Sequence, residues 1–164
     1  MHPPHAALVT EPIDITALLL RVSDEGVGAV TLFLGTVRNL NDGRAVTGID
    51  YEAYGAMAES ELRAIANDMV RANPQLRLAI EHRIGTLVLG DVSVAIAAGH
   101  AHRAQALDAS RAVIEAIKKC VPIWKREHYA EGDWNWVDPT ASGRTTHDLA
   151  TSVLASNLRA SGAS

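Results

Sequence analysis

The chain has 164 residues, of which 48% are hydrophobic and 21% charged, and 15 Lys and Arg against 19 Asp and Glu leave a formal net charge of −4. This length and composition predict one soluble globular domain, and they exclude a mostly disordered chain, a coiled coil and a collagen. The net negative charge excludes a global basic field for nucleic acid, so an anion site requires a local cluster of cations.

Cysteine content and the N-terminus predict an intracellular protein. Cys120 is the one cysteine, which excludes an internal disulfide framework and a cysteine-based zinc site. The first five residues lack the basic start and apolar stretch of a signal peptide. The longest apolar run, residues 27–37, is shorter than the roughly 20 residues that span a bilayer. We therefore expect a cytoplasmic location.

In chain order, the first expected elements are a short strand and a short helix. Residues 1–6 are expected to form a disordered end, and residues 7–10 a strand. Asp14 is placed to cap a helix over Ile15–Val22, because its carboxylate can accept from the free amides of the first turn.

Two apolar segments then predict strands, over residues 28–37 and 46–54. The polar segment between them contains Asp42-Gly43, a dipeptide typical of tight turns. The two strands are therefore predicted to form a hairpin with a long polar tip.

The rest of the body predicts two longer helices and four more strands. Helical spacing of apolar residues predicts helices over residues 56–72 and 104–120, the second with Leu107, Val113, Ile114 and Ile117 buried. The remaining strands are predicted over residues 76–84, 91–98, Ile123–Tyr129 and Trp134–Val137.

This succession, in which hairpins mix with two crossing helices, indicates an α+β fold. We expect one domain over residues 7–137. The Ala-, Ser- and Thr-rich residues 138–164 form a tail, in which a weak apolar stripe allows a loosely docked helix.

The distribution of cations is the clearest sign of chemistry. The chain has twelve arginines but only three lysines, Lys118, Lys119 and Lys125, within eight residues of one another. Lysine, unlike arginine, can lose its proton when buried and then act as a base or nucleophile. Attraction of lysines to a helix C-terminus is an alternative for the first two, but not for Lys125, which follows Pro122 in a strand.

A second group of cations lies where a strand gives way to a helix, at His100, His102 and Arg103. Free amides at a helix start favour an anion there. Arg38 leaves a buried strand at the start of a polar loop. Together these residues predict a pocket for a phosphate-bearing small molecule, although each alone could be an ordinary surface charge.

Two further features are interpreted as structural. Trp124, Trp134 and Trp136 are expected to form a small hydrophobic core rather than a stacking platform. Cys120, beside Lys119, is expected to pack at the helix end rather than to be a reactive thiol.

Several segments together resemble the catalytic (large) subunit of molybdopterin synthase, in order and spacing over residues 5–137. The segments are Phe33-Leu34-Gly35-Thr36-Val37-Arg38-Asn39, Tyr51-Glu52-Ala53-Tyr54 with Met57, His82-Arg83-Ile84-Gly85, Ala101-His102-Arg103 and Pro122-Ile123-Trp124-Lys125-Arg126-Glu127. The resemblance implies an α/β hammerhead-type fold with a mostly antiparallel sheet, two main helices and a small added β subdomain.

The resemblance also implies an activity, a sulfurtransferase of molybdenum cofactor biosynthesis. Its substrate is a cyclic pyranopterin monophosphate (precursor Z), which receives two dithiolene sulfurs to become molybdopterin. The sulfur arrives as a thiocarboxylate on the C-terminal Gly-Gly of a small ubiquitin-like subunit. Two copies of the large subunit form a homodimer within a heterotetramer, and no metal, cofactor, nucleic acid or membrane is expected to take part.

By position, the resemblance implies that Lys118 and Lys125 are catalytic. It implies that the substrate-binding residues include both lysines and Thr36, Val37, Arg38, His102, Arg103, Arg126 and Glu127. A non-catalytic module that grips an acidic tail or a phosphate-bearing ligand is the alternative function, and a phosphate-ester hydrolase is disfavoured because no metal constellation or obvious nucleophile is seen.

Overall fold

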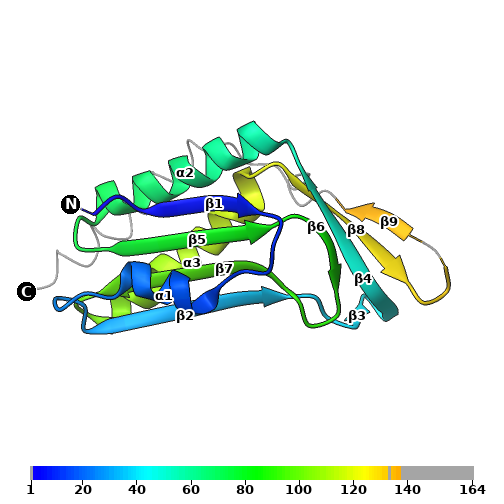
Figure 1. The fold of residues 1–164 in the computed structure, drawn as a ribbon, viewed down its shortest axis with the longest axis horizontal. Helices are drawn as coiled ribbons and strands as arrows, with labels where there is room; N and C mark the ends of the chain where they lie inside the picture. The colour runs from blue at the N-terminus through cyan, green and yellow to red at the C-terminus, as the bar shows by residue number, and fades with distance from the viewer. Residues whose placement is uncertain (1, 133, 138–164) are drawn as a thin grey trace, which may run out of the picture.

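The computed structural model describes residues 2–132 and 134–137. Two sheets meet end to end, and the first of them has helices on both faces (Figure 1). The helices are α1 (Ile15–Val22), α2 (Gly55–Ala72) and α3 (Arg103–Cys120). The strands are β1 (His5–Val9), β2 (Ala29–Thr36), β3 (Leu40–Asn41), β4 (Arg44–Ala53), β5 (Arg77–Arg83), β6 (Gly85–Val88), β7 (Val92–His100), β8 (Ile123–Tyr129) and β9 (Trp134–Val137).

The first sheet has four strands in the order β1-β5-β7-β2, of which only the β1–β5 pair is parallel. This mostly antiparallel sheet, with two long helices and a second small sheet, confirms the predicted α+β class. Its first strand begins at His5, and Ala6 is only 7% exposed. Residues 5 and 6, which were expected to belong to a disordered N-terminus, are therefore part of the first strand.

Helix α1 covers one face of this sheet and begins as the sequence predicted. The Asp14 carboxylate accepts a hydrogen bond of 3.0 Å from the Ala17 amide, which satisfies one free donor of the first turn. Leu18 and Val22 are fully buried against the small residues Ala79, Ala95 and Ala97 of the sheet.

Helices α2 and α3 cover the other face and enclose the main core. Their buried positions follow helical spacing, as in Ala106, Ala109, Val113 and Ile117 of α3. Leu107 was expected to be buried and is 58% exposed. It follows Ala106 by one residue, about 100° around the helix, and therefore lies off the face that meets the sheet.

The second sheet has five strands, in the order β3-β4-β8-β9, and β6 also pairs with β4, opposite β8. The predicted hairpin between residues 28–37 and 46–54 is wrong, because β2 pairs with β7 in the first sheet. The Asp42-Gly43 turn is real, but it joins β4 to the two-residue strand β3. Both turn residues have positive φ, 49° and 79°, the conformation of tight turns that match strand twist.

The second sheet has a small hydrophobic core of its own. Its buried residues are Val37, Val46, Ile49, Leu87 and Tyr129. The tryptophans do not form the expected core. Trp134 and Trp136 are 55% and 45% exposed, and both lie within cation–π distance of Arg126, at 5.6 and 5.1 Å. Strand alternation explains this placement, because Trp134 and Trp136 pair with His128 and Arg126 on the face away from that core.

Two expectations concern the chain as a whole. The tail at residues 138–164, with its docked helix, lies outside the described residues. Among the residues that are described, no helix is long and apolar enough to cross a membrane.

Candidate functional site

Lys125 and Glu127 form the centre of the candidate site, on the inner face of β8. Strand alternation places both on one face, as the sequence predicted, and Tyr129 continues that face. The Lys125 ammonium donates a hydrogen bond of 2.7 Å to Glu127 Oε1. The Glu127 side chain is 2% exposed and that of Lys125 27%, so a buried carboxylate anchors an amine that solvent can still reach.

Glu127 accepts hydrogen bonds from three different side chains. Tyr129 donates from its hydroxyl at 2.8 Å, and Asn41 Nδ2 lies 2.9 Å from Oε2 and 3.2 Å from Oε1. Burial alone would raise the pKa of Glu127, but the hydrogen bonds from Lys125, Tyr129 and Asn41 outweigh it and lower that pKa. The hydrogen bond to Glu127 in turn raises the pKa of Tyr129. The site therefore holds a fixed carboxylate anion.

Arg38 joins the same network through Asn41. Its Nη2 donates a hydrogen bond of 2.6 Å to Asn41 Oδ1, while the rest of the residue is exposed. Val37 anchors this loop, because it is 3% exposed in the second core and its amide and carbonyl bond Asp91 and Gly90. Thr36 and Arg38 thus flank a buried anchor, and Val37 itself faces the core.

Lys118 lies in the last turn of α3, which leads through Pro122 directly into β8. It is exposed, and it forms no hydrogen bond or ion pair with another described residue. Cys120, two residues further on, is half-buried, and burial together with the Glu61 carboxylate raises the pKa of its thiol despite Lys119. Its environment agrees with a packing residue, because a reactive thiol needs a lowered pKa.

The structure does not bring His102 and Arg103 close to Lys118 at the C-terminal end of α3. His102 is the N-cap of α3 and Arg103 its first residue, about 22 Å along the helix from Lys118. Both side chains are exposed, and the His102 amide donates a hydrogen bond of 3.0 Å to His100 Nδ1. Figure 1 shows the start of α3 at the end of the first sheet that lies away from the second sheet.

Arg126 lies on the opposite face of β8 from Lys125. Its guanidinium donates two hydrogen bonds, of 2.6 and 3.1 Å, to Asp50 Oδ2, which also lies 2.8 Å from His128 Nε2. Thr86 donates to the other carboxylate oxygen at 2.8 Å. Burial would raise the pKa of Asp50, but these hydrogen bonds prevail and lower it to about 2. Arg126 therefore belongs to an ion-pair cluster of its own.

Sequence reasoning missed Asn41, Asp50 and Tyr129. Asn41 is 86 residues from Glu127 and Asp50 is 76 from Arg126, so no local pattern connects either pair. Only the Asp42-Gly43 turn, directly after Asn41, marked the segment as ordered.

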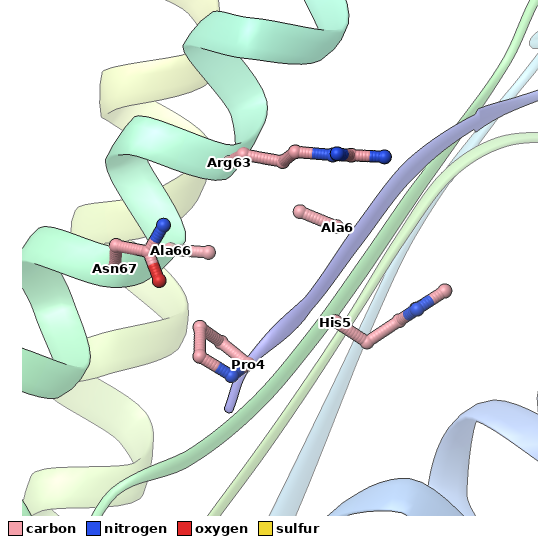
Figure 2. A pocket seen from close by; sticks show the side chains of 6 residues that line it. All are labelled: Pro4, His5, Ala6, Arg63, Ala66 and Asn67. Carbon is pink, nitrogen blue, oxygen red and sulfur yellow. The ribbon is translucent and has the colours of Figure 1, made fainter. Parts of the chain in front are cut away.

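A hollow of about 250 Å³ lies elsewhere, between the start of β1 and α2 (Figure 2). Its charged groups are already paired: Arg63 with Glu59 at 2.6 Å, and His5, which points away from α2, with Glu81 at 2.9 Å. Within residues 2–132 and 134–137, no group of three or more His, Cys, Asp or Glu side chains is arranged to hold a metal ion.

Comparison with known proteins identifies the family of the chain and agrees with its fold. A family model described as MoaE protein matches residues 8–120. The chain is 44% identical over 131 residues to the molybdopterin synthase catalytic subunit of Halalkalibacterium halodurans, covering 80% of this chain and 83% of that one. It is 42% identical over 139 residues to that of Oryza sativa subsp. indica, covering 82% and 72%.

Solved structures show the same architecture. A molybdopterin synthase structure from Staphylococcus aureus aligns with a TM-score of 0.77 and 36% identity, covering 80% of this chain and 96% of that chain. A chain of the complex between subunits 1 and 2 of molybdopterin-converting factor from Helicobacter pylori aligns with a TM-score of 0.63 and 21% identity, over 85% and 91% of the two chains, which shows the fold alone.

The fold is thus the α+β fold of molybdopterin synthase structures, with a lysine–carboxylate network on its second sheet. At this identity and coverage the chain belongs to the MoaE family, the catalytic subunits of the sulfurtransferase molybdopterin synthase. The resemblance that the sequence motifs predicted is confirmed.

Proposed function

We propose that this chain transfers sulfur to precursor Z, a cyclic pyranopterin monophosphate, and so produces molybdopterin. The sulfur donor is the thiocarboxylated C-terminus of a small ubiquitin-like subunit. The observation that carries the proposal is the Lys125 ammonium, held at 2.7 Å by a buried carboxylate and linked through Asn41 to Arg38. Family membership supplies the substrate class, and this network supplies groups suited to it.

In this reaction the thiocarboxylate sulfur attacks a carbon of the pterin side chain while an oxygen substituent departs. A cation and proton donor is needed where charge develops on the carbonyl or the departing oxygen. Lys125 meets that need, because Glu127 fixes its direction while part of the ammonium stays accessible. Lys118 supplies a second amine. It is exposed in the last turn of α3, the helix that leads into β8.

Arg38 is suited to the phosphate of the substrate. Its guanidinium uses one nitrogen on Asn41 and keeps other donors free for a planar, bidentate contact with an anion. His102 and Arg103 are also suited to an anion at the start of α3. Within one chain, however, they lie about 23 Å from Arg38, the length of β2.

A second copy of the chain resolves this separation, and we place it on strand β2. This strand ends the order of the first sheet, and its outward side chains Val30, Leu32 and Leu34 are 42%, 38% and 39% exposed. A two-fold axis at the middle of β2 would run the two strands antiparallel. The start of α3 in one copy would then lie beside Thr36 and Arg38 of the other, so that each site contains the partner's His102 and the partner's Arg103.

The proposed activity is tested by reconstitution. Purified protein, the thiocarboxylated small subunit and precursor Z are expected to yield molybdopterin, and Lys118→Ala and Lys125→Ala are expected to abolish it with the fold intact. Loss of the exposed Lys118 should change the free energy of unfolding by less than about 0.5 kcal/mol. Tight binding of both partners without product would instead support the non-catalytic binding module.

The shared site is tested by mixing Arg38→Ala with Arg103→Ala at a concentration of precursor Z so low that each variant alone has little activity. After subunit exchange, half of the dimers are hybrids with one intact site, so about a quarter of wild-type activity should return. No recovery would place both residues in one chain's site.

Leu32→Glu on β2 should give monomers, whereas Val88→Glu, an equally drastic change at the exposed Val88 of β6, should leave the dimer intact.

A further inference from the structure

Asn41 connects the two functional ends of the network described above. Its Oδ1 accepts from Arg38 at 2.6 Å, and its Nδ2 donates to both oxygens of Glu127, at 2.9 and 3.2 Å. We infer that Asn41 is a positioning residue of the proposed reaction, which holds the anion-binding guanidinium of Arg38 in fixed relation to the Lys125–Glu127 pair. This inference rests on the proposed function and adds to it a residue that couples substrate binding to the amine.

The chemistry of a primary amide explains why asparagine occupies this position. An amide presents an acceptor and a donor on one planar group, so it can join a guanidinium to a carboxylate. The partners also fix its orientation, because the reverse one would turn the carbonyl toward Glu127 and the NH₂ toward Arg38. An aspartate of the same size would keep the contact with Arg38 but would place a second carboxylate against Glu127.

The fold presents Asn41 rigidly. It ends the two-residue strand β3, pairs with Arg44 across the Asp42-Gly43 turn, and is half-buried. The Val46 amide donates a hydrogen bond of 2.9 Å to the Asn39 carbonyl and closes the base of the hairpin. A short, locally closed hairpin therefore carries a side chain to a carboxylate on β8, with few bonds free to rotate.

The balance of charge in the network points to an anionic ligand. The network holds two cations, Arg38 and Lys125, and one carboxylate, that of Glu127, which contacts only the lysine directly, so one positive charge remains uncompensated within the network. Arg38 is its most exposed member. A continuous chain of hydrogen bonds, through the amide of Asn41 and the carboxylate of Glu127, connects an anion bound at Arg38 to Lys125.

The test compares Asn41→Asp and Asn41→Ala with wild type in the reconstituted synthase, with Asn67→Asp as the matched control. Asn67 lies exposed on α2, so its variant makes the same change of charge away from the network. We expect both Asn41 variants to raise KM for precursor Z about tenfold and to lower kcat about tenfold, losses typical of misplaced charged groups. The thermal midpoint and the kinetics of Asn67→Asp should both stay near wild type.

Two readouts separate positioning from a merely structural role. In Asn41→Asp, a second carboxylate should raise the pKa of Glu127, so the acid limb of the kcat profile should move to higher pH. In addition, Arg38→Ala should cost less in the Asn41→Ala background than in wild type, because the two residues act as one unit. Wild-type kinetics in both Asn41 variants, or full additivity with Arg38→Ala, would overturn the inference. Absence of product with the wild-type chain would instead overturn the proposed function.

Discussion

Strand β8 presents a buried carboxylate network on each of its two faces, and the two networks differ in the partners that surround the carboxylate. On the inner face, Glu127 accepts from one cation, Lys125, and from the neutral donors Tyr129 and Asn41. On the outer face, Asp50 accepts two hydrogen bonds from Arg126, lies 2.8 Å from His128 and accepts a further bond from Thr86.

We interpret the inner network as the candidate site and the outer network as a structural cluster. The outer guanidinium uses two of its nitrogens on one carboxylate, and it lies within cation–π distance of the exposed Trp134 and Trp136. Among the described residues the inner ammonium has one partner, Glu127, and it retains donors for a ligand. Its carboxylate also accepts from the neutral donors Tyr129 and Asn41. A carboxylate anchored by neutral donors can direct a lysine while leaving its charge available.

The largest expected effect separates the two faces directly. Lys125→Ala should lower kcat by on the order of 10²–10⁴-fold, the usual contribution of a positioned proton donor. Arg126→Ala, one residue away but on the other face, should lower it less than tenfold. Single-turnover assays with saturating small subunit measure both. An equal loss in the two variants would contradict the division of labour between the faces.

The next effect tests whether Lys125 acts by its positive charge alone or requires the ammonium group itself. Lys125→Arg keeps the charge, but the guanidinium is planar, bulkier and never deprotonated near neutral pH. We expect kcat to fall nearly as far as in Lys125→Ala, because the compact ammonium contacts the reacting groups at short range. A turnover close to wild type would mean that charge alone suffices at this position.

Acid unfolding can compare the Glu127 and Asp50 networks once the contribution of a third titrating group, His82, is removed. Burial lowers the pKa of His82 to about 4 from an ordinary 6.5. Between these pH values the unfolded chain binds a proton that the folded chain does not, so wild type should lose about 3 kcal/mol of stability as pH falls from 6.5 to 4. His82→Phe should lack that loss, as urea unfolding at fixed protein concentration would show.

The two carboxylates titrate at lower pH. The pKa of Asp50 is lowered to about 2 from 3.8, so its contribution to stability is complete above pH 4 and disappears as pH falls to 2. We expect about 1 to 2 kcal/mol from it, which Asp50→Asn should remove from the acid unfolding curve. Glu127→Gln should likewise remove stability that is present at neutral pH and lost in acid, but it alone should also reduce kcat.

The smallest effect tests one bond of the outer cluster. Thr86→Val removes the hydroxyl that donates to Asp50 and should cost about 1 kcal/mol of unfolding free energy at pH 7. Because that bond also lowers the pKa of Asp50, the acid transition of the variant should begin at slightly higher pH. Its kcat should equal that of wild type, and a clear loss of turnover would link the outer cluster to the reaction.

The sequence by itself determined the elements and the alternation within them. Periodicity and capping placed α1, α2, α3 and β8 nearly to the residue, because these signals depend on neighbours within one or two turns. The same alternation placed Lys125 and Glu127 on one face of β8, which the structure confirms. Residue motifs also sufficed to identify the family.

Tertiary structure alone decided which strands pair and which side chains meet. Apolar residues predicted β2 and β4 as strands, but their partners, β7 and β8, lie far along the chain and gave no local signal. For the same reason the bond from Asn41 to Glu127 and the distance between Arg38 and His102 could not be predicted. Pairing depends on the total surface that a sheet buries, whereas helix and strand propensity depends on adjacent residues.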